Sequence, residues 1–118
     1  MRTLPKELRK LGFSEDELRA AAFDYCLRTN LAIPQAPLEA LEVGDDPEAT
    51  VTLKFDTMHT ADEKEVKLSR DQVGAALIRF CSDHKIPLPR HGQKVLQVQN
   101  GEISLMVNIH WTSDKKKE

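Results

Sequence analysis

The sequence predicts an α+β domain made of two copies of a helix-strand-strand unit. Three observations predict it: an ungapped internal repeat, a helix-start signal in each copy, and two strand-like runs after each helix. We expect the order αββαββ, with a mainly antiparallel four-stranded sheet, both helices packed on one face, and a short additional helix at the N-terminus. A length of 118 residues, 31% of them charged and 40% hydrophobic, suits one globular domain.

Composition excludes several classes of protein. The 5 Gly and 6 Pro do not fit a collagen-like or low-complexity chain, and no apolar run approaches the roughly 20 residues that span a bilayer. Residues 1–13 lack the apolar segment of a secretory signal, so we expect a cytoplasmic protein. Two cysteines are too few for a disulfide scaffold, and we expect both to be reduced.

The repeat is visible when the chain is offset by 55 residues. Residues 13–44 then align on residues 68–99, and eight of the 32 positions are identical, where chance gives about two. The identical pairs are Ser14/Ser69, Asp16/Asp71, Ala20/Ala75, Ala21/Ala76, Cys26/Cys81, Pro34/Pro89, Leu41/Leu96 and Val43/Val98.

Each copy begins with a helix signal. Ser14 is followed three positions later by Glu17, and Ser69 by Gln72, which is the spacing of a capping box. Prolines after each helix favour an extended approach to the strands. The predicted buried faces are residues 18, 21, 22, 25, 26 and 29 in the first helix and 73, 76, 77, 80 and 81 in the second.

Two strand-like runs follow each helix. In the second copy Asn100 and Gly101 separate residues 94–99 from 102–111, and Asn-Gly is a strong hairpin signal. In the first copy residues 38–43 and 49–57 flank a Gly-Asp-Asp-Pro turn. Matching the apolar residues of the final strands requires an offset of 54, so we expect this turn to carry one extra residue.

Alternation assigns the two faces of the sheet. The outward face carries no aromatic platform for stacking bases, which disfavours single-stranded RNA binding there. Solvent exposure and a protein interface both remain open for this face. The inward residues are Leu41, Val43, Val51, Leu53, Phe55, Leu96, Val98, Ile103, Leu105, Val107 and Ile109, and the outward ones Leu38, Ala40, Glu42, Thr50, Thr52, Lys54, Val95, Gln97, Gln99, Ser104, Met106, Asn108 and His110.

The expected domain covers residues 1–112, with repeats at 13–57 and 68–111. Outside the repeats, residues 3–11 fit a short helix capped by Thr3, and residues 65–68 fit a short extra strand. Residues 113–118 have the composition of a disordered basic tail.

The chain offers little catalytic chemistry. No nucleotide-binding, serine-hydrolase or zinc-protease motif is present. Cys26 and Cys81 lie on the apolar helix faces, where a thiol is a small core residue more often than a nucleophile. The four histidines lack the spacing of metal ligands. We therefore predict no catalytic residue, no metal and no cofactor.

One segment carries a distinctive charge. Residues 1–67 have a net charge of −5 and residues 68–118 a net charge of +3, and no acidic residue lies between Asp83 and Glu102. A Pro-stiffened basic loop can face phosphates or an acidic partner, although an ordinary solvated loop is the simpler interpretation. The candidate partner-binding residues are Lys85, Arg90, His91 and Lys94.

Three functions follow from these observations. The leading hypothesis is a non-enzymatic protein-interaction or regulatory module, for which a homodimer through the open sheet face or an edge is one form. The alternative is a weak nucleic-acid-binding protein that uses the basic loop of residues 84–94, although the overall charge of −2 falls short of that class. A small enzyme with Cys or His chemistry is the third, and it requires an accessible thiol.

Overall fold

The computed structural model describes residues 6–34, 36–56, 65–90 and 92–110. These residues form six strands and two helices in the order βαβββαββ. The expected basic tail at 113–118 lies outside the described residues. The elements are β1 (Lys6–Phe13), α1 (Glu15–Arg28), β2 (Leu38–Val43), β3 (Val51–Phe55), β4 (Glu65–Leu68), α2 (Arg70–Asp83), β5 (Gln93–Gln99) and β6 (Glu102–His110).

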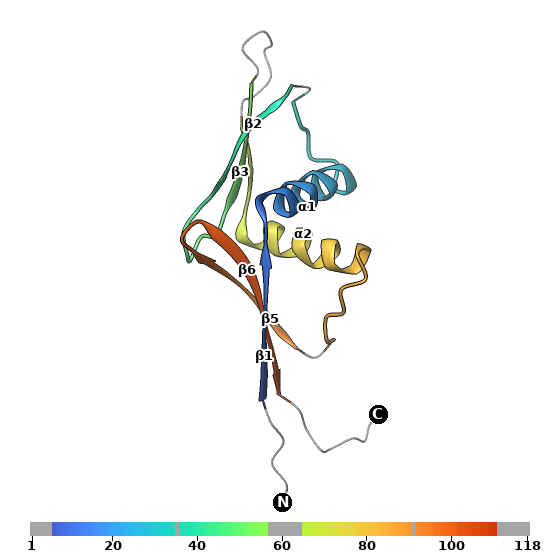
Figure 1. The fold of residues 1–118 in the computed structure, drawn as a ribbon. Coiled ribbons are helices and arrows are strands. Elements are labelled where there is room, and N and C mark those ends of the chain that lie inside the picture. The colour runs from blue at the N-terminus through green and yellow to red at the C-terminus, as the bar shows by residue number, and fades with distance from the viewer. Residues whose placement is uncertain (1–5, 35, 57–64, 91, 111–118) are drawn as a thin grey trace, which may run out of the picture.

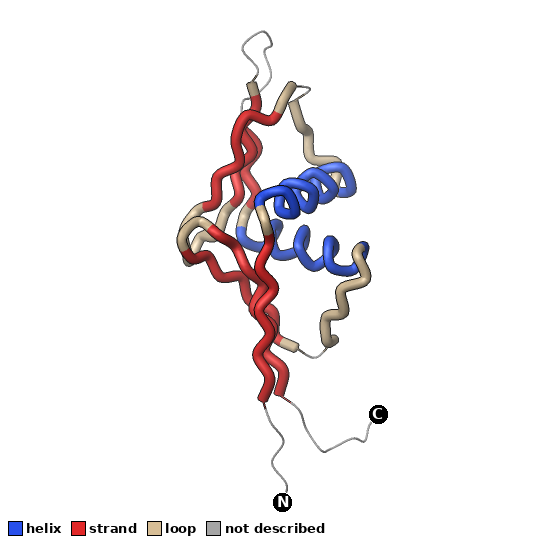
Figure 2. Tube along the Cα trace, in the orientation of Figure 1, coloured by secondary structure: helices blue, strands red, loops and turns tan. Residues whose placement is uncertain are grey.

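The strands form two antiparallel three-stranded sheets, with both helices on one side of them (Figures 1 and 2). One sheet has the order β1-β6-β5 and is called the β6 sheet after its central strand; the other has the order β2-β3-β4 and is called the β3 sheet. Each contains a hairpin from one half of the chain and a single strand from the other half. The two halves therefore depend on each other for a complete sheet.

The expectation of one four-stranded sheet is wrong, and so is the N-terminal helix at residues 3–11. Residues 6–13 form β1, which pairs over its whole length with β6. The spacing of Leu8 and Leu11 suits a helix, but in the strand Leu11 packs against the core and Leu8 is 60% exposed. Pairing with β6 decides the outcome, because tertiary context overrides a weak local helix preference.

The predicted helix starts are confirmed. Ser14 and Ser69 are the N-caps of α1 and α2, and each forms a complete capping box with Glu17 or Gln72. Both helices have 14 residues. The residues of the predicted buried faces are buried, or partly buried at Tyr25 and Phe80, except that Thr29 is exposed and its hydroxyl donates to the carbonyl oxygen of Tyr25.

The Asn100-Gly101 hairpin is confirmed, with both turn residues at positive φ, as a tight β-hairpin turn requires. The predicted length of the first turn is wrong. Val43 pairs with Val51, eight positions later, whereas Val98 pairs with Ile103, five positions later, so the first connection is three residues longer. Three, like one, is an odd number, so the predicted inward faces are unchanged.

A register irregularity in β2 makes one further prediction wrong, the outward orientation of Leu38. The pairing of β2 with β3 shifts between Leu38 and Ala40, so that Leu38 lies opposite Phe55 and packs against the core instead of facing outward. An extra residue in one strand of an antiparallel pair bends the strand and reorients the side chains before it.

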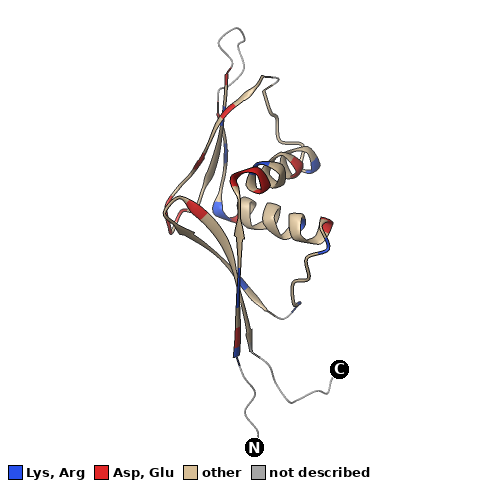
Figure 3. Ribbon diagram, in the orientation of Figure 1, with Lys and Arg blue, Asp and Glu red and all other residues tan. Residues whose placement is uncertain are grey.

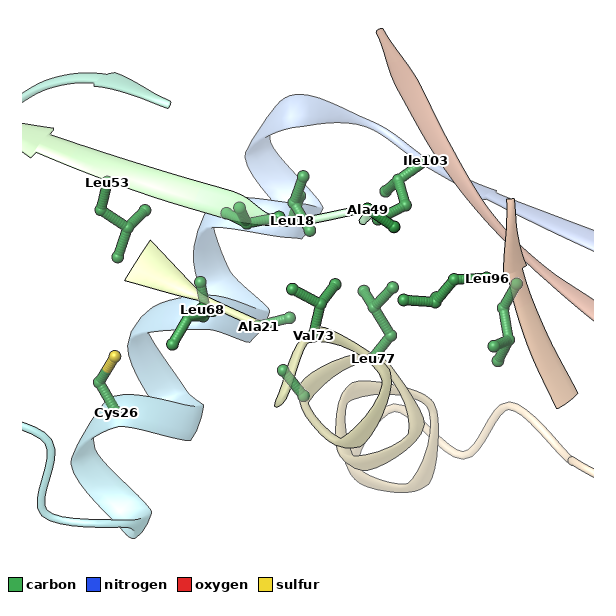
Figure 4. Packing of buried hydrophobic residues seen from close by; sticks show 14 of the residues in the cluster. Leu18, Ala21, Cys26, Ala49, Leu53, Leu68, Val73, Leu77, Leu96 and Ile103 are labelled. Atoms are coloured by element: carbon green, nitrogen blue, oxygen red, sulfur yellow. The ribbon is translucent and has the colours of Figure 1, made fainter. Parts of the chain in front are cut away.

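A single hydrophobic core lies between the helices and both sheets (Figure 4). Leucine, valine and isoleucine from the two sheets meet small residues on the helices, among them Ala21 and Ala76, so the helices can approach closely. The core belongs to both halves. Its buried members are Leu18, Ala21, Ala22, Cys26, Ala49, Val51, Leu53, Phe55, Leu68, Val73, Ala76, Leu77, Leu96, Ile103, Leu105, Val107 and Ile109.

Candidate interaction surface

On the outer face of the β6 sheet, away from the helices, the charged residues are Lys6 and Lys10 of β1 and Glu102 at the start of β6. The outward residues of β5 and of β6 from Ser104 to Asn108 are all uncharged. Leu8 of β1 is 60% exposed and Val95 of β5 is 46% exposed, and together with Met106 they line a hollow of about 510 Å³, at whose rim Asp46 and Arg70 lie. Such a mixture of exposed aliphatic and amide side chains suits contact with another protein.

The outer face of the β3 sheet has a different chemistry. Lys54 on the central strand lies 2.9 Å from Glu42 of β2 and 3.8 Å from Glu65 of β4. The hydrogen bond to Glu42 raises the pKa of the Lys54 amine. Charged groups that pair along a sheet face remain hydrated and resist desolvation by a partner. This face is therefore a poorer candidate for binding.

The free edge of β5 is held by two side chains from elsewhere in the chain. The guanidinium of Arg70 donates to the carbonyl oxygen of Leu96 at 2.7 Å and to that of Pro47 at 2.9 Å. Asp46 accepts from the backbone N–H of Val98 at 3.0 Å and lies 3.4 Å from Arg70. These contacts fasten the β2-β3 connection to the edge of the β6 sheet.

A groove of about 450 Å³ runs between α2 and β5. Gly74, Ala75 and Ile78 form its helix side, Lys94 and Val95 contribute from β5, and Leu105 also lines it. Ile78 is 39% exposed. The groove lies on one side of the β5 edge and the 510 Å³ hollow on the other, and Arg70, Val95 and Leu96 line both.

Gly74 has no structural reason to be glycine. A Cβ built at this position meets no atom within 4 Å, and its φ lies outside the positive region. Glycine inside a helix costs about 1 kcal/mol relative to alanine. At the equivalent position of α1, Arg19 covers the surface and forms ion pairs of 3.8 Å with Glu15 and Asp16. The helix surface is thus open in one half and covered in the other.

The predicted basic residues are partly brought together. The amine of Lys94 donates to the carbonyl oxygens of Pro89 and Gly92, which holds it against the loop that carries the exposed Arg90. Lys85 is exposed at the end of α2, and His91 lies outside the described residues. In the described part of the chain, the ion pairs do not include Lys85, Arg90 or Lys94.

The cysteines and histidines are placed as follows. Cys26 and Cys81 are free and fully buried, and burial raises the pKa of both thiols. His84 stacks on Phe80 at a ring distance of 4.1 Å, with its Nδ1 3.0 Å from the Phe80 carbonyl oxygen. Of the other three histidines no side chain is described. Among the described residues, no cluster of His, Cys, Asp and Glu could hold a metal ion.

Sequence reasoning missed Arg70, Asp46 and Gly74. Two signals were present: the repeat places Arg70 opposite Glu15 and Gly74 opposite Arg19, so charge and size change sharply at two neighbouring positions of an otherwise similar helix. Figure 3 shows the outcome, with acidic residues at the start of α1 and few charges along α2. The contacts of Arg70 and Asp46 with β5 are long-range and carry no local pattern.

Comparisons with known proteins assign the chain to no family. No family model, no curated protein and no solved structure matches the chain. In the described ranges, neither helix combines the length and apolarity needed to cross a membrane.

Proposed function

We propose that this chain is a non-enzymatic, cytoplasmic protein-interaction module that binds its partner through the β6 sheet. The observation that carries the proposal is the contrast between the two outer faces. Leu8, Val95 and Met106 line one hollow on the β6 sheet, whose two charged lining residues, Asp46 and Arg70, pair with each other at its rim, whereas Lys54 and its two glutamates occupy the β3 sheet. Binding a protein desolvates the contact area, which costs least where charges are absent.

The experiment is capture of partners from the native host with three forms of the tagged chain. Leu8→Lys places a charge on the β6 sheet, and Thr52→Lys places the same charge on the β3 sheet beside Glu42. We expect a specific partner to be retained by the wild type and by Thr52→Lys and to be lost with Leu8→Lys. Equal retention by all three forms would reject the β6 sheet as the binding face. Light scattering identifies a second copy of the chain as the partner if the wild type is a dimer and Leu8→Lys a monomer.

Nucleic-acid binding is the second candidate, and it is favoured by Lys85 and Arg90, which form no ion pair with the described residues. Against it, Lys94 is engaged with loop carbonyls and Arg70 with the edge of β5. Of the described basic residues in the 84–94 loop, Lys85 and Arg90 are then left for phosphates, whose neutralisation supplies most non-specific affinity. Binding to DNA or RNA that weakens steeply with salt and is lost on Arg90→Ala would support this candidate over the first.

We also infer that the two halves arose by duplication of a strand-helix-strand-strand unit. Several backbone details recur at an offset of 55 and support this inference. Asn30 and Lys85 follow the helices at φ 60° and 59°, and the N–H groups of Leu31 and Ile86 donate to the carbonyl oxygens of Cys26 and Cys81. The surfaces of the two halves then diverged after the duplication, and the ability to bind a partner was kept or gained in one half only. Residue swaps between the halves, given in the Discussion, test this inference.

A further inference from the structure

We propose that the groove between α2 and β5 receives an extended, acidic segment of a partner protein, which adds as a strand to the free edge of β5. This inference deepens the proposed function and rests on it. Three independent features support it: an open strand edge with a hollow on either side, a glycine that the isolated fold does not require, and cations along the groove.

The edge of β5 suits strand addition. Residues 94, 96 and 98 direct their backbone groups away from β6, since Leu96 and Val98 bond there to Arg70 and Asp46. An added strand points alternate side chains to opposite faces of the sheet. One set would enter the groove beside Ile78, and the other would enter the hollow beside Met106.

Arg70 and Asp46 limit where the segment can pair. They already satisfy the carbonyl of Leu96 and the N–H of Val98. In the described part of the chain, no hydrogen bond reaches the outward backbone groups of Lys94. The added strand therefore pairs around Lys94 and ends where Arg70 begins, so only a short segment is bound.

Gly74 gives the incoming segment its space. The position lines the groove, and a Cβ built there meets no atom within 4 Å. A local rule broken without structural need often marks a functional site. The backbone of a strand lying between α2 and β5 approaches the helix closely, and the absence of a side chain at Gly74 permits that approach. Arg19 would obstruct the same approach in the first half.

The charges around the groove specify an acidic partner. The groove is lined by Lys94, whose amine binds two loop carbonyl oxygens, by Arg70, which already pairs with Asp46, and by one acid, Asp71. Arg90 belongs to the loop that Lys94 contacts, and among the described residues none of the basic residues Lys85, Arg90 and Lys94 forms an ion pair. Carboxylates at one end of the bound segment would compensate these cations.

The test uses the intact chain and a random library of nine-residue peptides displayed on phage. We expect the selected peptides to alternate aliphatic residues with others and to carry Asp or Glu at one end. Their affinities are then measured by fluorescence polarisation with synthetic labelled peptides. Selection of no peptide, or of peptides without acidic residues, would overturn the proposal.

Two arginine substitutions on α2 separate the groove from the general charge of the helix. Gly74→Arg reproduces the residue of the first half and should weaken peptide binding at least tenfold. Ser82→Arg adds the same charge at an exposed position outside the groove and should change affinity less than twofold. Gly74→Arg should also melt at or above the wild-type temperature, since arginine favours the helix more than glycine does. Equal affinity of the two variants would overturn the proposal.

Nuclear magnetic resonance locates the bound peptide. We expect changes in amide chemical shift at Lys94, Leu96 and Ile78 and none at the equivalent β2 positions Glu39 and Leu41. The reverse pattern would contradict binding in the groove.

The capture of partners from the native host separates this inference from the proposed function. A partner lost with Leu8→Lys but retained by Gly74→Arg would reject the groove alone, whereas a partner retained by both would reject the proposed function as well.

Discussion

The two sheets share an arrangement of strands but differ on their outer faces. On the β3 sheet, Lys54 bridges Glu42 and Glu65 across three strands. On the β6 sheet, the central position Met106 lies between Lys10 of β1 and Val95 of β5, and no acid faces that lysine from the opposite strand. Both sheets supply inward residues to the one core, so the packing of that core does not account for the difference between the outer faces. We attribute the difference to the binding role that we propose for the β6 sheet.

The helices repeat this contrast on the other side of the sheets. Glu15 and Arg19 of α1 pair with each other, whereas their counterparts Arg70 and Gly74 hold the β5 edge and leave a groove open. Both changes alter the same end of the helix, next to the edge strand. The two helices thus begin with the same capping box and differ at surface positions close to β5.

The largest expected effect tests whether both halves share one core. Leu53 and Leu105 occupy the centre of β3 and β6 and are 0% and 1% exposed. Leu53→Ala and Leu105→Ala should each lower the free energy of unfolding by about 3 kcal/mol, because each leaves a cavity in the same core. Urea unfolding should stay a single transition in both variants. Two separate transitions, or a loss in only one variant, would show that the halves fold independently.

The next effect compares Arg70 with its counterpart Glu15. Arg70→Ala removes hydrogen bonds to two backbone carbonyls and the contact with Asp46, and we expect a loss of about 1.5 kcal/mol. Glu15→Ala removes only exposed ion-pair and helix-dipole contributions, and we expect a loss of about 0.5 kcal/mol or less. Chemical denaturation measures both. Equal losses would mean that Arg70 does not fasten the β5 edge.

The helix caps should behave alike. Ser14→Ala and Ser69→Ala each remove one acceptor for a helix-end N–H, and each should cost about 1 kcal/mol. Replacing either serine by Asp should restore most of that stability, since Asp is an equally good N-cap. Thermal melts check this pair. A loss of stability in only one of the two alanine variants would show that the two caps are not equivalent.

The smallest effect is a pH dependence from the buried thiols. Burial raises the pKa of the Cys26 and Cys81 thiols, so the native chain keeps these protons to a higher pH than the unfolded chain does. The thiols of the unfolded chain ionise at about pH 8.5. The unfolded state then binds fewer protons, and stability should fall as the pH rises above that value. The Cys26→Ala and Cys81→Ala variants should each fall less steeply than the wild type in urea titrations at pH 8 to 10. An unchanged slope in both would contradict the assigned cause.

The sequence allowed local features to be predicted where a short pattern determines them. Ser14 and Ser69 mark helix starts, Asn100-Gly101 marks a hairpin, and alternation gives the inward residues of the strands. The strand at residues 6–13 could not be predicted because its pattern suits a helix and its partner, β6, lies about a hundred residues away. The first turn was misjudged because Ala49, at positive φ, turns back into the core, which lengthens the connection.

The candidate site was predictable only in part. Charge counting found the basic segment that contains Arg90 and Lys94. It could not find Arg70, which reaches Pro47 and Leu96 across 23 and 26 positions. Gly74 could have been identified from the sequence, since glycine is unfavourable inside a predicted helix and usually has a packing or functional reason there. Its position beside β5 could not, because that depends on the packing of α2.

The most direct test of the account is hydrogen exchange of the chain in complex with the partner captured from its host. Amides of β5, β6 and β1 should become protected relative to the free chain, with the strongest change around Lys94, while β2, β3 and β4 exchange as before. Protection confined to the β3 sheet, or spread equally over both sheets, would contradict the assignment of binding to the β6 sheet.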